Sequence, residues 1–410
     1  MYNDYKELTR DRAISAVTVP EYLYVPLSQH TGAPAKALVG KGDKVKRGQL
    51  IGSTDAFVTA NVHSPVSGEI DELVSIRTPQ GNFVETLKIK NDFKDELDPA
   101  LKNYGDPEQF SAEDIREIIR EIGLVGMGGA AFPTHVKVSP PKDKKVDTLI
   151  LNAAECEPYL NADYRLLLEY PGTVIMGLRL IAKAAGASKV IVGIEDNKKI
   201  VLDGLKAAGV EEFAKIVVIP SVYPAGAEKI MVKKVSGRQV PKKGIPLDVG
   251  VVVVNVGTVY QLACSVKTGL PLLERIVTVS GEFANPGNYL VRVGTLYQDI
   301  VKLPAKYAEK DYRIISGGPM MGFAVSQLDI PVTKGTSGLI LLKAQIFKET
   351  NCIRCAYCVD ACPLGLLPYQ ERGLDDCMEC GLCAFVCPSR RYLVQKAKEY
   401  KIERKTKVNK

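Results

Sequence analysis

Eight of the chain's ten cysteines lie in two copies of one spacing. The copies are CIRCAYCVDACP, residues 352–363, and CMECGLCAFVCP, residues 377–388, and each reads Cys-x-x-Cys-x-x-Cys-x-x-x-Cys-Pro. Three thiolates at this spacing can point at one metal centre from a tight loop, so a fourth must come from further along the chain. Structural zinc sites instead use two Cys-x-x-Cys pairs separated by a longer arm. The pattern therefore predicts iron–sulfur clusters in preference to zinc.

Because the motif occurs twice, the fourth cysteine of each copy is expected to ligate the cluster of the other copy. The predicted ligands of one [4Fe-4S] cluster are Cys352, Cys355, Cys358 and Cys387. The predicted ligands of the second [4Fe-4S] cluster are Cys377, Cys380, Cys383 and Cys362. This double-cubane ferredoxin pattern indicates one-electron transfer, with a purely structural role as the alternative.

Length and hydropathy indicate a multidomain globular protein. At 410 residues the chain is too long for one ordinary core. The N-terminal sequence MYNDYKELTRDRAISAV has no apolar run of the kind that secretory signals carry, so the chain is expected to stay in the cytoplasm. Asn255 and Gln261 interrupt the most apolar stretch, residues 249–266. That stretch predicts a buried strand followed by a helix, not a membrane span.

The net charge of +7 comes from the C-terminal end. Residues 390–410 carry nine Lys or Arg against Glu399 and Glu403, and the rest of the chain is balanced. A solvated, fraying end is the commoner explanation of such a tail, and contact with anionic lipid or an acidic partner is the alternative. The balanced body has no basic face interleaved with aromatics, which argues against nucleic-acid binding.

A glycine-rich loop follows a predicted helix in SAEDIREIIREIGLVGMGGAAFPTHVK, residues 111–137. Ser111 and Asp114 fit a helix-capping pattern, and isoleucines then recur at helical spacing up to Gly123. An ordinary dinucleotide-binding turn follows a strand instead, so a GxGxxA match here is misplaced.

The glycines remain chemically suggestive. Gly126, Gly128 and Gly129 would let the backbone approach a flat or phosphorylated ligand, with Lys137 as a nearby cation. A plain turn between two elements is an equally open interpretation of this loop.

Downstream, the apolar runs VDTLIL, KVIVGI, KIVVIP and GVVVVNV alternate with helical patterns. Such alternation predicts a parallel sheet covered by helices on both faces. Ligands of these sheets gather at the carboxyl ends of the strands. Polar residues at the predicted ends are Asn152, Glu155 and Glu157 after the first strand, Glu228 in YPAGAE after the third, and Asn255 after the last.

Together, the loop GLVGMGGAAFPTHVK, the NAAECEP turn, YPAGAE, NVGT and the doubled cysteine motif resemble one family, the C subunit of the Rnf (Rsx) electron-transport complex. The middle portion is similar to the flavin- and NADH-binding 51-kDa subunit of respiratory complex I. The resemblance covers nearly the whole chain, and the motifs come in the family's order.

The resemblance implies an FMN held by the glycine loop. The residues implied to line the flavin are Gly126, Gly128, Gly129 and Lys137. Phe132 would stack on a nicotinamide or adenine ring. Further contacts to the flavin or its loop are implied for Asn152, Glu155 and Asn255. Glu157 and Glu228 match acidic positions near the dinucleotide, where a carboxylate favours NAD over NADP.

The implied architecture is α/β and multidomain. Its parts are a lipoyl-like barrel-sandwich domain (20–95), a Rossmann-like parallel-sheet FMN/NAD domain (111–271), a β-grasp (SLBB-like) domain (272–335), a double [4Fe-4S] ferredoxin-type domain (345–395) and a basic tail (396–410). Residues 57–63 contain no lysine where a lipoyl domain would carry its modified one. The front domain is therefore expected to be a scaffold.

The implied function is that of the NAD-facing electron-transfer subunit of a membrane-bound, Na⁺- or H⁺-transporting ferredoxin:NAD⁺ oxidoreductase. Electrons would pass between two [4Fe-4S] clusters and NAD(H) through FMN, because flavin converts between single electrons and hydride. Integral and peripheral partner subunits would move the ion, ferredoxin would be an indirect partner, and the chain would lie peripherally on the cytoplasmic side of the cell membrane. The alternatives are a soluble flavin/iron–sulfur NADH dehydrogenase subunit without ion coupling and a cluster-only electron-transfer adaptor.

Overall fold

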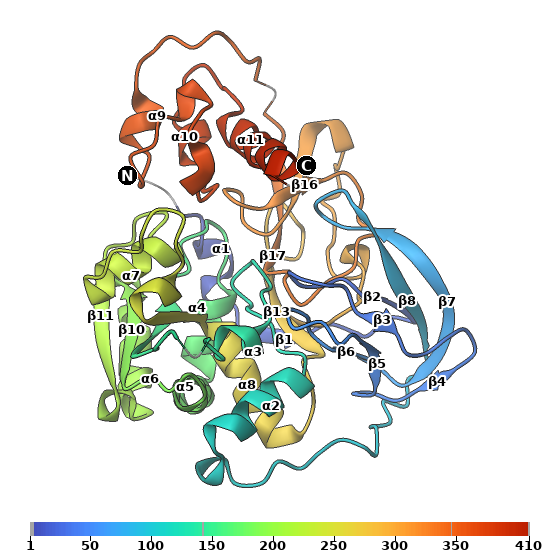
Figure 1. Ribbon diagram of the computed structural model, residues 1–410. Coiled ribbons are helices and arrows are strands. Elements are labelled where there is room, and N and C mark those ends of the chain that lie inside the picture. Colours follow the sequence, from blue (N-terminus) through green and yellow to red (C-terminus); the bar gives the residue numbers. More distant parts are fainter. Residues whose placement is uncertain (1–3, 142, 346, 409–410) are drawn as a thin grey trace.

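The computed structural model describes residues 4–141, 143–345 and 347–408. In Figure 1 the front part of the chain (blue) lies at the right and the parallel-sheet part (green) at the left, and the cysteine-rich C-terminal helices (red) lie together above the parallel-sheet part. No helix within these described ranges is long and apolar enough to span a bilayer.

The front of the chain forms a sandwich of two antiparallel sheets, as expected. One sheet has the order β2 (Tyr22–Pro26), β8 (Phe83–Asn91), β7 (Gly68–Arg77), β4 (Lys44–Val45). The other has the order β3 (Lys36–Ala37), β5 (Leu50–Ser53), β6 (Val62–His63). Alternating strand residues such as Leu23, Val25, Leu87 and Ile89 point inward and are fully buried. We call this unit the sandwich.

The middle of the chain contains the predicted parallel sheet. Its order is β11 (Ala214–Ile219), β10 (Lys189–Glu195), β9 (Thr148–Ala153), β12 (Val251–Asn255), and every pairing is parallel. After β9, the strands β10 and β11 are added in turn on one side of β9, and β12 is then added on its other side. Sheets with such a reversal bind ligands outside the carboxyl ends of the strands at the switch point, here β9 and β12. We call this edge of the sheet the crevice.

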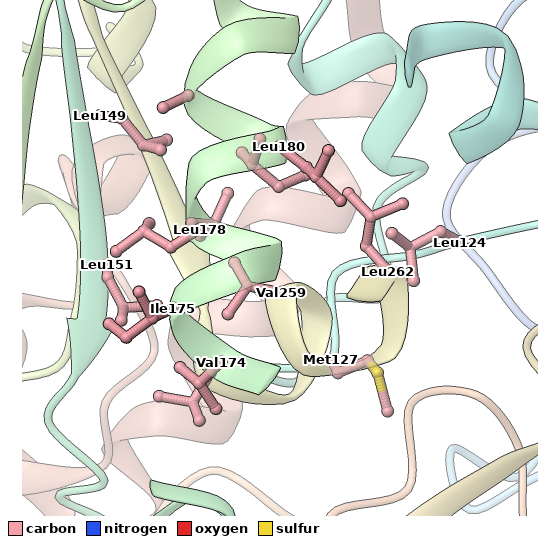
Figure 2. Packing of buried hydrophobic residues seen from close by; sticks show 14 of the residues in the cluster. Leu124, Met127, Leu149, Leu151, Val174, Ile175, Leu178, Leu180, Val259 and Leu262 are labelled. Atoms are coloured by element: carbon pink, nitrogen blue, oxygen red, sulfur yellow. The ribbon is translucent and has the colours of Figure 1, made fainter. Parts of the chain in front are cut away.

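Helices cover both faces of this sheet. They are α4 (Ala162–Glu169), α5 (Pro171–Ala185), α6 (Lys199–Ala207), α7 (Glu228–Ser236) and α8 (Val256–Thr268). Leu149 and Leu151 pack with α5 and α8 on one face (Figure 2), whereas Ile150 lies in a separate core with Met231 of α7. Because helices bury these strands on both faces, the strand sequences are nearly continuous apolar runs.

The glycine-rich loop begins where helix α2 (Ala112–Glu121) ends. The predicted cap is confirmed, because Ser111 and Asp114 form a reciprocal capping box. The isoleucine face of α2 is buried in the same core as α5. After the loop the chain forms the short helix α3 (Thr134–Lys137).

A six-stranded sheet forms the next part. Its order is β1 (Ile14–Ala16), β14 (Gly287–Arg292), β13 (Glu274–Gly281), β17 (Gly338–Lys343), β15 (Tyr312–Ser316), β16 (Phe323–Val325). Two features differ from the sequence expectation: the sheet continues to Lys343, beyond residue 335, and it includes β1, which precedes the sandwich and follows helix α1 (Glu7–Arg10). Pairing with β1 covers the edge of β14, whose backbone groups would otherwise lack strand partners.

The C-terminal part contains α9 (Tyr357–Asp360), α10 (Leu382–Phe385) and α11 (Leu393–Val408). Most of the predicted basic tail, residues 396–408, belongs to the helix α11, and its residues 409–410 lie outside the described residues. Basic side chains of α11 bond to an acidic loop, with Lys396 to Glu371 at 2.8 Å, Lys401 to Glu379 at 2.8 Å and Arg404 to Asp375 at 2.7 Å. These partly exposed pairs join the helix to the loop that precedes and contains the second cysteine motif.

Lys334 joins three parts of the molecule from a fully buried position. The residue precedes β17, and its Nζ donates to the carbonyls of Asn61 in the sandwich (2.5 Å) and Gly123 at the start of the glycine loop (2.7 Å). Burial lowers the pKa of Lys334 to about 7.

Lys334→Met is expected to destabilise the protein by about 1–3 kcal/mol, because the buried Gly123 carbonyl and the part-buried Asn61 carbonyl lose their donor. Lys334 is mostly neutral in the folded protein above about pH 7, but the unfolded chain keeps the proton up to about pH 10.5. Since the unfolded state binds more protons in this window, the contribution of Lys334 to stability rises with pH. Urea midpoints measured from pH 7 to about pH 10 should therefore rise less steeply in Lys334→Met. An unchanged slope, equal to that of a variant at the exposed Lys41, would contradict the assignment.

Candidate functional site

The glycine loop lies over the carboxyl end of β12. The Gly126 N–H donates to the Phe132 carbonyl at 2.8 Å, which closes the loop on itself. The Met127 N–H donates to Thr258 Oγ1 of α8 at 2.9 Å, in a buried position. A Cβ added to Gly128 would lie 3.3 Å from the Cβ of Asn255, the last residue of β12. The loop is thus held directly at the crevice where the strand order reverses.

The outer side of the loop is open. Gly128 and Gly129 are exposed, and Gly129 has a φ of +119°, which L side chains rarely adopt. A Cβ added at Gly129 would meet no atom of the described residues within 4 Å. Bare backbone therefore faces open space at the crevice, which fits close approach of a flat ring or a phosphate.

Asn255 connects the strand end to a carboxylic acid that sequence reasoning missed. Its Oδ1 accepts from the Gly257 N–H (2.8 Å) and caps α8, while its Nδ2 donates to Asp163 Oδ2 (2.5 Å). Burial, and then the nearby charge of Glu155, raise the pKa of Asp163 to about 7. In the sequence, Asp163 is an ordinary acidic residue near a helix start, so no local signal marks it.

Two of the predicted site residues hold turns together. Asn152 Nδ2 donates to the Gly226 carbonyl at 2.7 Å, joining the end of β9 to the YPAGAE turn. The buried Glu155 carboxylate accepts from the N–H groups of Asp163 and Tyr164, both at 3.1 Å, at the start of α4. The structure thus brings both residues to the crevice, with their side chains already bonded to backbone.

Buried lysines balance the acids below the crevice. Lys198 Nζ donates to the Ala153 carbonyl at 3.1 Å and pairs with Glu195 Oε2 at 3.0 Å. Lys6 Nζ donates to the Glu155 carbonyl at 2.7 Å, and burial lowers the pKa of Lys6. Lys6 comes from the N-terminal segment, so its place here depends on tertiary contacts that the sequence pattern does not reveal.

Lys137 and Glu228 meet at the opening of the crevice. Lys137 ends α3 and Glu228 begins α7, and Nζ lies 2.5 Å from Oε1. The Glu228 side chain is 46% exposed. The structure therefore pairs the cation expected at the flavin with an acid expected near the dinucleotide.

Glu157 has a different setting. Its carboxylate accepts from the N–H groups of Met320 (3.1 Å) and Met321 (2.9 Å), in the turn between β15 and β16. Burial raises the pKa of Glu157 to about 7, although these two N–H donors act against the rise. This side chain joins the parallel-sheet part to the six-stranded sheet.

The second predicted cysteine set surrounds one small enclosed space. Cys362, Cys377, Cys380 and Cys383 all line a cavity of about 20 Å³. Its other walls include Leu364, Leu366 and Leu393, which exclude water. Burial raises the pKa of Cys383 to about 12, and the neighbouring thiols of Cys377, Cys380 and Cys362 add to the rise.

Part of the first predicted set also comes together. Cys358 and Cys387 are buried side by side with Leu393. Burial raises the pKa of Cys358, and Cys387 and Cys352 contribute to the rise. Cys352 is exposed and Cys355 is half-buried.

The second cysteine set lines a cavity, whereas a single metal ion would draw its ligands to one point. Within the described residues, no three His, Cys, Asp or Glu side chains converge as a single metal ion would require. A cubane binds each thiolate through a different iron, so its ligands stand apart around the cluster. The four thiols that line one cavity have the donor chemistry of a [4Fe-4S] cluster, in which each iron takes one cysteine sulfur.

The second cysteine motif contacts the segments before and after helix α7 of the parallel-sheet part. The Tyr223 hydroxyl, in the loop before α7, donates to the Cys380 carbonyl at 2.7 Å in a buried contact. The Lys243 N–H donates to Asp376 Oδ1 at 2.5 Å. Near these contacts, Glu228 and Cys377 both line a cleft of about 270 Å³.

Tyr223→Phe should weaken the contact between the loop before α7 and the second cysteine motif, without removing any predicted ligand of the flavin or of the clusters. Losing one buried hydrogen bond, typically about 0.5–1.5 kcal/mol, should speed amide hydrogen exchange in residues 377–383 by about 2- to 12-fold. Tyr357→Phe, at an exposed tyrosine of the same C-terminal part, is the matched control. Equal exchange in the two variants would show that the hydroxyl contributes nothing to docking.

Known proteins with the same sequence pattern identify the family. The chain is 44% identical over 370 residues to the C subunit of the proton-translocating ferredoxin:NAD(+) oxidoreductase complex of Clostridium ljungdahlii, covering 89% of this chain and 81% of the relative. It is 41% identical to the C subunit of the Na(+)-translocating ferredoxin:NAD(+) oxidoreductase complex of Acetobacterium woodii, with 90% and 86% covered. The chain belongs to this family of C subunits. The family is the one that the sequence motifs indicated.

Family models divide the C-subunit chain in the order expected from its motifs. Residues 1–94 match the RnfC barrel sandwich hybrid domain, residues 119–264 the Nuo51 FMN-binding domain, and residues 276–324 the SLBB domain. The sandwich, the FMN-type α/β part and the SLBB part are thereby confirmed.

One solved structure supports the fold. It is an NAD⁺-reducing [NiFe]-hydrogenase in the H₂-reduced state, matched with a TM-score of 0.51 and 23% identity. The match covers 74% of this chain, which spans about half (56%) of that hydrogenase chain.

Proposed function

We propose that this C subunit is the NAD-facing electron-transfer subunit of a membrane-bound, ion-translocating ferredoxin:NAD⁺ oxidoreductase. The observation that carries the proposal is the direct contact between the two predicted redox regions: the loop that ends at α7 bonds to the second cysteine motif through Tyr223 and Cys380. The relatives of this chain are named as C subunits of complexes that translocate protons or Na⁺.

The crevice at the glycine loop is proposed to bind FMN. The backbone of Gly126, Gly128 and Gly129 would lie against the cofactor, because its outer side is open. Lys137 would supply positive charge to the phosphate or to an anionic ring, after exchanging part of its contact with Glu228. When bound, FMN supplies conversion between hydride and single electrons, and iron–sulfur clusters supply one-electron transfer.

Two [4Fe-4S] clusters are proposed to be held by the eight motif cysteines. Cys362 would join the second motif, since it lines the same cavity as Cys377, Cys380 and Cys383. Cys387 would join Cys352, Cys355 and Cys358, in line with its burial against Cys358. The leucines that line the cavity would keep water from the sulfurs, which tunes a cluster's potential.

NAD(H) is proposed to enter beside Phe132 and Glu228. Glu228 is half-exposed at the crevice opening and can accept hydrogen bonds from ribose hydroxyls, and its charge disfavours the extra phosphate of NADP. Glu157 is a weaker candidate for this contact than its sequence position implied, because its carboxylate already accepts two backbone hydrogen bonds.

Purification from native membranes tests the assignment to a complex. An affinity-tagged chain is expected to co-purify with integral subunits and to be digested by protease only when the cytoplasmic face is accessible. Recovery of the tagged chain as a free protein that oxidises NADH would favour the soluble dehydrogenase alternative. Recovery with clusters but no response to NADH would favour the adaptor alternative.

A further inference from the structure

The sandwich contacts the outer end of the glycine loop through one threonine. Thr31 lies in the turn between β2 and β3, and its N–H donates to the Ala131 carbonyl at 3.2 Å. Its Oγ1 donates to the Ala130 carbonyl at 2.9 Å. Two successive carbonyls of the glycine loop are therefore bound by a single residue of a different part of the chain.

These bonds fix the direction of loop N–H groups as well as carbonyls. A peptide unit is planar, so binding the Ala130 carbonyl sets the orientation of the Ala131 N–H, and binding the Ala131 carbonyl sets that of the Phe132 N–H. Ala131 has a φ of +47°, a conformation that non-glycine residues adopt rarely. A loop with such a residue persists in one shape only when outside contacts hold it there.

The turn that carries Thr31 is itself held rigidly. A Cβ added at Gly32, whose φ is +121°, would lie 2.2 Å from the Val58 carbonyl oxygen, so the 30–33 turn and the 57–60 turn pack backbone to backbone. The Ala60 N–H donates to His30 Nε2 at 2.9 Å. Thr31 is thus presented by two interlocked turns.

The sandwich also contacts the inner end of the glycine loop. Asn61 Nδ2 donates to the Glu121 carbonyl at 3.3 Å, and the Asn61 carbonyl shares Lys334 Nζ with the Gly123 carbonyl. Beyond the loop, His135 Nε2 bonds to the Phe57 carbonyl at 3.2 Å. The sandwich therefore touches the loop before Gly126 and after Gly129, leaving the exposed middle facing the crevice.

We propose that the sandwich is a structural half of the flavin site, with Thr31 as the positioning residue that orients the glycine loop for the cofactor. The inference rests on the proposed binding of FMN to this loop. It assigns a role in cofactor binding to a part of the chain that has the shape of a carrier domain but no modifiable lysine in residues 57–63.

Thr31→Val tests the role of the hydroxyl, because valine keeps the shape and the backbone N–H. Titration of FMN into flavin-free full-length chain, followed by quenching of flavin fluorescence, should show affinity weakened about 3- to 10-fold. Thr31→Ser keeps the donor and should bind as the wild type does. Thr78→Val is the matched control: Thr78 lies in the β7–β8 turn of the same sandwich, and its hydroxyl has no hydrogen-bond partner within the described part of the chain.

The iron content should be the same in all four proteins, and the melting temperature of the flavin-free chain should differ by no more than a few degrees, as the loss of a single hydrogen bond or buried hydroxyl allows. Unchanged FMN affinity in Thr31→Val, or equal weakening in Thr31→Ser, would overturn the role of Thr31. A wild-type chain that takes up no FMN would instead overturn the proposed flavin site itself, so the two failures are distinguishable.

Discussion

Cys362→Ala should remove the cluster of the second cysteine motif, although Cys362 belongs to the first. The reason is geometric: Cys362 lines one cavity with Cys377, Cys380 and Cys383. The anaerobically purified variant should hold about four irons where the wild type holds about eight. Its remaining cluster should be the one held by Cys352, Cys355, Cys358 and Cys387.

Cys387→Ala is the reciprocal variant and should lose the other cluster. Electron paramagnetic resonance of the reduced variants should then show a different single-cluster spectrum in each. The wild-type spectrum should contain both signals, with additional features from spin coupling between the two reduced clusters. Identical residual spectra in the two variants would contradict the exchange of fourth ligands. Retention of the second motif's cluster in Cys362→Ala would contradict it as well.

Gly129→Ala should abolish or strongly weaken flavin binding. Its φ of +119° is strained for any residue with a Cβ, at a cost of about 1–3 kcal/mol. The loop can relieve this strain only by moving, and it lies where the cofactor is proposed to sit. We expect FMN affinity to fall about 10- to 100-fold, measured by fluorescence quenching.

Gly42→Ala separates backbone strain from cofactor binding. Gly42 has a φ of +87°, and a Cβ there, as at Gly129, meets no atom of the described residues within 4 Å. Both variants should therefore lose similar stability, but only Gly129→Ala should lose flavin. Equal FMN affinity in the two variants would remove the glycine loop from the proposed site.

Much of this architecture follows from local patterns in the sequence. The alternation of apolar strands with helices predicts the parallel sheet, because burial on both faces leaves the same signature in any such fold. The Ser111–Asp114 cap of α2 is readable because its two bonds connect residues three apart. Family resemblance adds the order of the parts and the FMN-type character of the middle one.

No local sequence pattern predicts the contacts between the parts of the chain. Lys334, Asp163 and Lys6 become significant only through partners far along the chain, and an isolated lysine or aspartate normally indicates a solvated surface. Strand β1 was missed because it is three residues long and pairs with β14 across most of the chain. The helical end was missed because its basic pattern matches a free tail equally well, until Glu371, Asp375 and Glu379 are seen beside it.

Anaerobic mixing of the purified, cofactor-loaded chain with NADH would show whether this chain carries electrons between NAD(H) and its clusters. NADH should bleach the visible absorbance of the flavin first and the broader iron–sulfur absorbance afterwards, and NADPH should have a much weaker effect. Loaded flavin and clusters that do not respond to NADH would contradict the claim that this chain connects NAD(H) to its clusters.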